Sequence, residues 1–239
     1  MKTPLLALVM VALTHAASAQ VVVTHSSVAP SLDIVLSHPL PSAENRAGNT
    51  WRWREESEQP RNETAQLFQT DTAFNLTGIV LHAPSSSQTT VDRPFKLIVE
   101  KFTGATLNGG REEVSAQSGL LPSFGAGGYI HFSLGQAVAI EADQIYGLRL
   151  AFDGPQTSNT MGFTLDNIGT TLPFGEYFYY YNPSISANLI PIATQTAVYY
   201  ITGSVVPEPG VVTLGALGGF GLLLFASRLR PRKRSGFSV

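Results

Sequence analysis

The 239-residue chain contains no cysteine. This absence excludes disulfide cross-links, thiol nucleophiles and metal sites built on cysteine. The stability of the folded part must therefore come from the burial of apolar side chains.

Charged residues are also scarce, at 13% of the chain. The segment from Gln20 to Val206 holds nine basic and sixteen acidic residues, so its formal charge is −7. Because binding to nucleic acid phosphates requires a basic surface, we expect no nucleic acid partner. Glycine and proline are frequent, with 22 and 15 residues, which is not the composition of a helical protein.

Motifs that would indicate catalysis are missing as well. The sequence has no Gly-x-Ser-x-Gly elbow, no phosphate-binding Gly-x-x-x-x-Gly-Lys loop and no His-Glu-x-x-His metal motif. We therefore predict that the protein is not an enzyme and needs no cofactor or metal. A secreted hydrolase acting on polysaccharide remains the alternative, because it would need only two suitably spaced carboxylates. The acidic side chains considered for that role, or for a calcium site, are Glu55, Glu56, Glu58, Glu112, Glu113, Asp153 and Asp166.

The first 19 residues have the pattern of a signal peptide. Lys2 is followed by an apolar stretch over residues 4–13 and then by the small residues Ala17 and Ala19 at the two positions that signal peptidase reads. We expect cleavage after Ala19 and export of the mature chain from Gln20.

Near the C-terminus, residues 210–227 form an uncharged, largely apolar run of 18 residues, just long enough for a transmembrane helix. A basic cluster follows this run. The positive-inside rule then predicts that the run spans the inner membrane, with the C-terminus in the cytoplasm and the domain outside. The residues of the cluster are Arg228, Arg230, Arg232, Lys233 and Arg234.

Pro207, Glu208 and Pro209 stand directly before the apolar run. Prolines on both sides of the carboxylate keep this segment extended and accessible to a processing enzyme. The Pro-Glu-Pro, the apolar run and the basic cluster, residues 207–234 together, resemble the PEP-CTERM sorting signal of Gram-negative bacteria. The resemblance implies processing by an exosortase and delivery to the cell surface or exopolysaccharide matrix. A plain type I membrane anchor, retained without processing, is the alternative.

Between these signals, residues 20–206 are expected to form one domain. From Gln66 onward, short runs rich in β-branched and aromatic residues alternate with segments rich in glycine, proline, asparagine and serine. In one run, Phe95, Leu97 and Val99 share a face, with Lys96 and Glu100 opposite. We predict an all-β fold, an antiparallel β-sandwich or jelly roll. The order of these runs also resembles jelly-roll domains found ahead of PEP-CTERM tails.

Aromatic rows supply the candidate ligand-binding residues of the domain. Side chains with one polar edge can stack on sugar rings, but they can equally anchor a sheet to its core. The sequence leaves both interpretations open, with polysaccharide as the expected ligand in the first. The two rows, each with its members on one face of an extended strand, are Trp51 with Trp53 and Tyr177 with Tyr179 and Tyr181.

Overall fold

The computed structural model describes residues 20–41, 50–55, 63–85, 92–125, 127–153, 159–168, 170–181 and 188–206. The chain divides into two compact units, Met1–Val205 and Val206–Val239. The expected signal peptide and the expected sorting signal, including its apolar run, lie outside the described residues. Among the residues that are described, no helix is long and apolar enough to cross a membrane.

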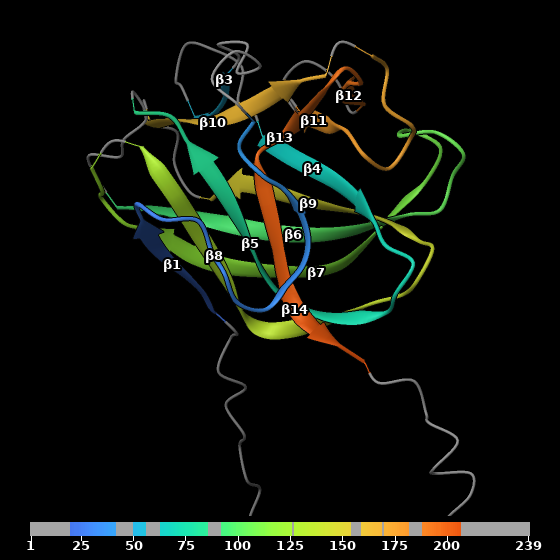
Figure 1. Ribbon diagram of the computed structural model, residues 1–239, viewed down its shortest axis with the longest axis horizontal. Coiled ribbons are helices and arrows are strands. Elements are labelled where there is room, and N and C mark those ends of the chain that lie inside the picture. Colours follow the sequence, from blue (N-terminus) through green and yellow to red (C-terminus); the bar gives the residue numbers. More distant parts are fainter. Residues whose placement is uncertain are drawn as a thin grey trace, which may run out of the picture. The chain divides into compact units, whose positions relative to one another are not determined.

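The first unit is all-β, as the composition predicted, and its described residues contain strands but no helix (Figure 1). Three strands precede the region from Gln66 onward in which the sequence indicated strands. The strands are β1 (Gln20–Ser26), β2 (Ile34–His38), β3 (Thr50–Glu55), β4 (Glu63–Gln69), β5 (Phe74–Ala83), β6 (Arg93–Phe102), β7 (Arg111–Leu121), β8 (Gly128–Ile140), β9 (Ile145–Phe152), β10 (Asn159–Asn167), β11 (Phe178–Tyr181), β12 (Leu189–Ile192), β13 (Gln195–Ala197) and β14 (Tyr199–Val205).

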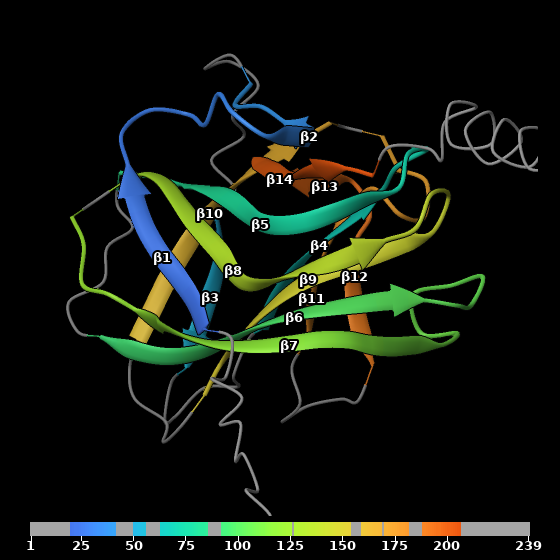
Figure 2. The same ribbon diagram turned by 90° about the horizontal axis from the view of Figure 1, so that it is seen from below.

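Eleven strands form one large sheet in the order β12-β11-β4-β9-β6-β7-β1-β8-β5-β14-β2. Neighbouring strands are antiparallel except β1 and β7, which are parallel. The sheet curls over on itself (Figure 2), so that Phe95 of β6 packs edge-on against Phe132 of β8, with 5.6 Å between ring centroids. These two strands are not neighbours in the sheet, and their contact therefore crosses the core.

The small sheet β13-β10-β3 covers an open side of this curl. Its β3 contributes Trp53, whose ring stacks on Phe152 of β9 at 3.9 Å between centroids and 7° between planes. Its β10 contributes Met161, Phe163 and Leu165 to the same core cluster. The small sheet is thus attached to the large one by apolar side chains that share one interior.

The periodicity of β6 agrees with the sequence prediction on the inner face. Phe95, Leu97 and Val99 are fully buried in the main core, and Lys96 on the opposite face is partly exposed. Glu100, however, is buried on that opposite face. The strand is therefore covered on both sides at its C-terminal end.

The cover on the outer face is a second apolar cluster. Leu67 and Phe102 from the sheet meet Leu107 from the segment between β6 and β7, together with Tyr179 of β11 and Leu189 of β12. This outer layer lies over β4, β6 and β9, and it creates a dry environment for polar groups on the outer face of these strands.

The two edges of the large sheet are short strands with irregularities. At one edge, β2 pairs with β14 through a register shift next to Val35. At the other, β12 carries Pro191, which has no backbone N–H to offer. Both devices disfavour the addition of a further strand.

Candidate functional site

The first aromatic row belongs to the core. Trp53 is completely buried, packed among Phe95, Phe132 and Phe152. This burial removes Trp53 from the set of residues that could stack on a ligand. Trp51 pairs in backbone register with Phe163 of β10, and its side chain lies outside the described residues.

In the second row, two tyrosines pack in the outer cluster and the third contacts arginine side chains. Tyr177 and Tyr179 are buried in the outer cluster, and Tyr181 is partly buried at its border. The guanidinium groups of Arg111 and Arg149 lie 5.2 Å and 5.4 Å from the centroid of the Tyr181 ring. The tyrosines therefore anchor β11 to the outer face of the sheet, which is the second of the two interpretations that the sequence left open.

A buried cluster of charges lies beneath these tyrosines. The Arg149 guanidinium donates to Glu63, and it donates to Glu100 Oε1 at 2.8 Å. The Tyr179 hydroxyl donates to Glu100 Oε2 at 2.8 Å, and Arg111 Nη1 lies 3.5 Å from Glu100 Oε1. We call Glu63, Glu100, Arg111, Arg149 and Tyr179 the Arg149 cluster.

Electrostatics keep the Arg149 cluster in one charge state. Burial opposes the charge of Arg149, but the hydrogen bond and negative charge of Glu100, with the charge of Glu63, raise the pKa of the guanidinium. Burial, followed by the charge of Glu100, raises the pKa of Tyr179 well above its usual range. Each charged group in the cluster faces a group of opposite charge. The cluster is therefore a structural element of the outer layer.

A different polar site lies where the two ends of the curled sheet meet. A cleft of about 250 Å³ opens between β2 and β14 on one side and the end of β4 on the other. The segment around Gly175 forms a further wall. We call this site the seam cleft. It is lined by Leu36, Ser37, His38, Phe68, Gln69, Ile168, Leu172, Gly175, Glu176, Thr196 and Tyr199.

Two local features hold the walls of the seam cleft in place. Gln66 of β4 accepts a hydrogen bond from the backbone N–H of Ala197 at 2.8 Å and so ties the two sides together. Gly175 has φ of 109°, a left-handed conformation that favours glycine, and this turn leads directly to Glu176.

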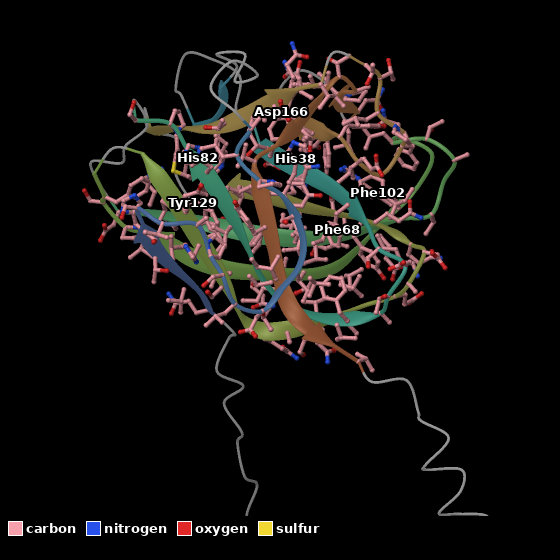
Figure 3. All side chains as sticks on the ribbon, viewed as in Figure 1. His38, Phe68, His82, Phe102, Tyr129 and Asp166 are labelled. Carbon is pink, nitrogen blue, oxygen red and sulfur yellow. The ribbon has the colours of Figure 1, made fainter. Side chains whose placement is uncertain are left out.

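An imidazole–carboxylate pair stands at one side of the cleft. His38 Nε2 lies 2.8 Å from Asp166 Oδ2 (Figure 3), joining β2 to β10. Two residues earlier on β10, Thr164 Oγ1 lies 2.7 Å from His82 Nδ1 of β5. The first pair reaches the cleft through His38, whose side chain is 32% exposed.

Tyr199 and Glu176 supply the unpaired polar groups of the cleft. Tyr199 is only 7% exposed, yet its hydroxyl forms no hydrogen bond to another described residue. Burial, followed by the negative charge of Glu176, raises the pKa of Tyr199. Both residues line the cleft. Glu176 is exposed and forms no ion pair with another described residue.

A hollow of about 300 Å³ lies on the outer face of β5, β8 and β14. Thr77 and Thr202 in its wall hydrogen-bond to one another at 3.3 Å. Burial, followed by the charge of His25, lowers the pKa of His131, whose Nε2 is buried without a partner. This hollow therefore provides a ligand with a neutral imidazole and hydroxyls that are already paired, whereas the seam cleft provides a carboxylate and an unpaired hydroxyl.

The acidic residues considered from the sequence are dispersed. Asp153 lies 3.4 Å from Lys96, and Asp166 is bound to His38. Glu112 and Glu113 are exposed neighbours on β7. Within the described ranges, no group of three or more histidine or acidic side chains could hold a metal ion. Glu56 and Glu58, and the side chain of Glu55, lie outside those ranges.

The residues of the expected processing signals also lie outside the described part of the chain. The structure therefore gives no geometry for any of them. They are Ala17, Ala19, Pro207, Glu208, Pro209, Arg228, Arg230, Arg232, Lys233 and Arg234.

Comparison with known proteins gives little. No protein-family model matches the chain, and no curated protein matches it either. One solved structure that it resembles is that of the cysteine protease and lectin-like domains of Cwp84, a surface layer associated protein of Clostridium difficile, with a TM-score of 0.38 and 13% identity. The match covers 61% of this chain but only 32% of the solved one. The site is therefore interpreted from its own residues.

The sequence did not predict that the residues of the seam cleft would be neighbours. His38 and Asp166 are 128 positions apart, and Glu176 and Tyr199 belong to different elements again. The one available signal was Asp166, which the sequence offered only as a candidate ligand of a calcium site. Its partner could be found only from the way β10 lies across the large sheet.

Proposed function

We propose that the protein is an exported, non-enzymatic component of the bacterial cell surface or its matrix, sorted by its C-terminal signal and processed by signal peptidase and exosortase. The observation that carries this proposal is the position of the described strands between the two expected processing sites. Among the described residues, strands run from Gln20, directly after the expected cleavage position, to Val205, two residues before Pro207.

This extent matches a domain released by two cleavages. Val21 is 2% exposed in the main core, and β14 pairs with β5 through Val205 opposite Phe74. Processing at both expected positions would leave these strands intact.

The finer classification of the fold belongs to the same proposal. We place the domain with β-sandwiches and jelly rolls, because a curled antiparallel sheet and a small covering sheet enclose one apolar core. The apolar core of this domain is built without disulfides, because the chain has no cysteine.

The test is the mature mass and cellular fraction of the protein in its native host, for the wild type and for Glu208→Ala. We expect the wild type to lack residues 1–19 and the residues beyond Pro209, and the variant to retain its tail in the inner membrane. Glu112→Ala, an exposed substitution within the domain, is the matched control and should be processed normally. If both wild type and Glu208→Ala keep residues 210–239, the tail is a plain membrane anchor and the sorting proposal is wrong.

A further inference from the structure

We propose that the seam cleft binds one amino-sugar ring of a matrix polysaccharide, with the ammonium group of the sugar against Glu176 and its hydroxyls against Tyr199 and His38. This inference rests on the proposed function for the presence of a polysaccharide matrix, but it concerns a site and a ligand class that the sorting signal does not specify.

The size of the cleft sets the size of the ligand. At about 250 Å³ it is smaller than the ~300–1,000 Å³ typical of sites for drug-sized molecules. One sugar ring can enter such a space while the rest of a polymer stays outside.

The lining has the two kinds of surface that a sugar ring presents. Leu36, Ile168 and Leu172 provide apolar area for the C–H face of the ring. Ser37, His38 and Gln69 provide polar groups at the rim for its hydroxyls. A purely apolar ligand would leave these polar groups without water or partners, at a cost in free energy.

An unpartnered hydroxyl gives an independent indication of a ligand. Tyr199 is more than nine-tenths buried, and its hydroxyl makes no hydrogen bond to another described residue. The hydroxyl oxygen is not among the buried side-chain atoms of the described residues that lack a partner, so it is accessible from the cleft. A sugar hydroxyl in the cleft would pair with it, accepting from or donating to the phenol oxygen.

The charges of the cleft select among sugars. Its ionisable groups are the Tyr199 phenol, the Glu176 carboxylate and the His38–Asp166 pair, and among the described residues no lysine or arginine lines it. The mature segment as a whole is also acidic, with sixteen acidic against nine basic residues from Gln20 to Val206. A protonated amino sugar would meet an uncompensated carboxylate at Glu176, whereas a uronic acid would be repelled by it.

The experiment measures binding of the full chain in mild detergent to three tetrasaccharides by calorimetry, at a pH at which the amine carries its proton. The probes are oligomers of glucosamine, of N-acetylglucosamine and of glucuronic acid. We expect glucosamine oligomers to bind most tightly and the uronate not to bind. Glu176→Gln should weaken glucosamine binding at least tenfold, because a charge-assisted contact becomes neutral.

Two further variants make the test specific. Tyr199→Phe should weaken binding about three- to tenfold, and Glu112→Gln, an exposed acid on β7, should leave the affinity unchanged. Far-ultraviolet circular dichroism of each variant verifies that it is folded. Absence of binding by the folded wild type, equal affinity for the uronate, or unchanged affinity in Glu176→Gln would each overturn the proposal.

Two other results separate this inference from the function proposed above. Release of shortened oligosaccharides would identify a hydrolase and overturn the role of pure binding. Processing of the tail is measured by mass in cells and does not depend on the cleft. A binding failure with normal processing therefore rejects the ligand alone, and a processing failure with normal binding rejects the sorting route alone.

Discussion

The Arg149 cluster and the seam cleft contain the same kinds of chemical group and differ in how those groups are paired. In the cluster, Arg149 contacts two carboxylates, and one of these also accepts from Tyr179. In the cleft, the hydroxyl of Tyr199 and the carboxylate of Glu176 have no partner among the described residues.

This difference distinguishes structural from functional polar groups in this fold. Burial alone does not do so, since Tyr179 and Tyr199 are both almost completely buried. What distinguishes them is whether the folded chain itself provides a partner. Groups that the chain pairs contribute to stability, and an unpaired group that reaches the seam cleft, such as the Tyr199 hydroxyl, is available to a ligand.

The largest effect is expected from Glu100→Ala. This change leaves Arg149 with one carboxylate instead of two in a dry environment, and it removes the acceptor of Tyr179. We expect the free energy of unfolding to fall by about 3–5 kcal/mol, measured by urea denaturation. Glu176→Ala is the matched change in the cleft and should alter stability by less than about 0.5 kcal/mol. Similar losses of unfolding free energy in both variants would contradict the distinction between the cluster and the cleft.

A matched pair of tyrosine variants tests the same point with the loss of one oxygen atom. Tyr179→Phe removes a hydroxyl that donates to a buried carboxylate at 2.8 Å, so unfolding should become easier by about 1.5–3 kcal/mol. Tyr199→Phe removes a hydroxyl without a partner, and we expect no loss of stability. Thermal denaturation of the two proteins side by side provides the measurement, and a larger loss for Tyr199→Phe would contradict our assignment.

Gly147→Ala tests the packing that holds Tyr179 in place. A Cβ atom at this position would lie 2.7 Å from the Tyr179 hydroxyl and 3.0 Å from Phe102. The substitution should displace the ring and reduce stability by about 1–3 kcal/mol. Its effect should shrink in a Tyr179→Phe background, where the clashing oxygen is gone, and additive losses would show that the strain arises elsewhere.

The smallest effect concerns His131, which is neither paired nor placed at the cleft. Burial lowers its pKa below 6.5 in the folded state, so the unfolded chain binds more protons in acid. Its contribution to stability is therefore present above pH 6.5 and is lost as the pH falls below that value. In His131→Gln, the decline of the melting temperature between about pH 6.5 and 5 should be shallower than in the wild type. Identical slopes would show that other groups control the acid side.

The sequence predicted the inner face of the sheet better than the outer face. In β6, the alternation of Phe95, Leu97 and Val99 identified core positions correctly. The same alternation marked Glu100 as solvent-facing, although it is buried. Its cover comes from distant segments around Leu107 and Leu189, and the periodicity of one strand carries no information about such segments.

The site was harder to predict than the fold for the same reason. Aromatic rows such as Trp53 and Tyr179 are visible in the sequence, but their pattern is identical for a core and for a binding face. The groups of the seam cleft come from the ends of several strands. They meet only because the sheet curls until β4 lies near β14, and the length of that curl is a property of eleven strands together.

One consequence of the strand order concerns mechanical load. The cleft lies at the start of β14, where Tyr199 pairs with His38, and β14 runs from that end to Val205 (Figure 1), after which the expected sorting signal follows in the sequence. Its seven residues span about 20 Å and are hydrogen-bonded to β5 on one side and β2 on the other. If the chain is held beyond Val205 while a bound polymer is pulled by flow, tension runs along β14. The hydrogen bonds on both sides would then be sheared together, an arrangement that resists force better than peeling them apart one by one.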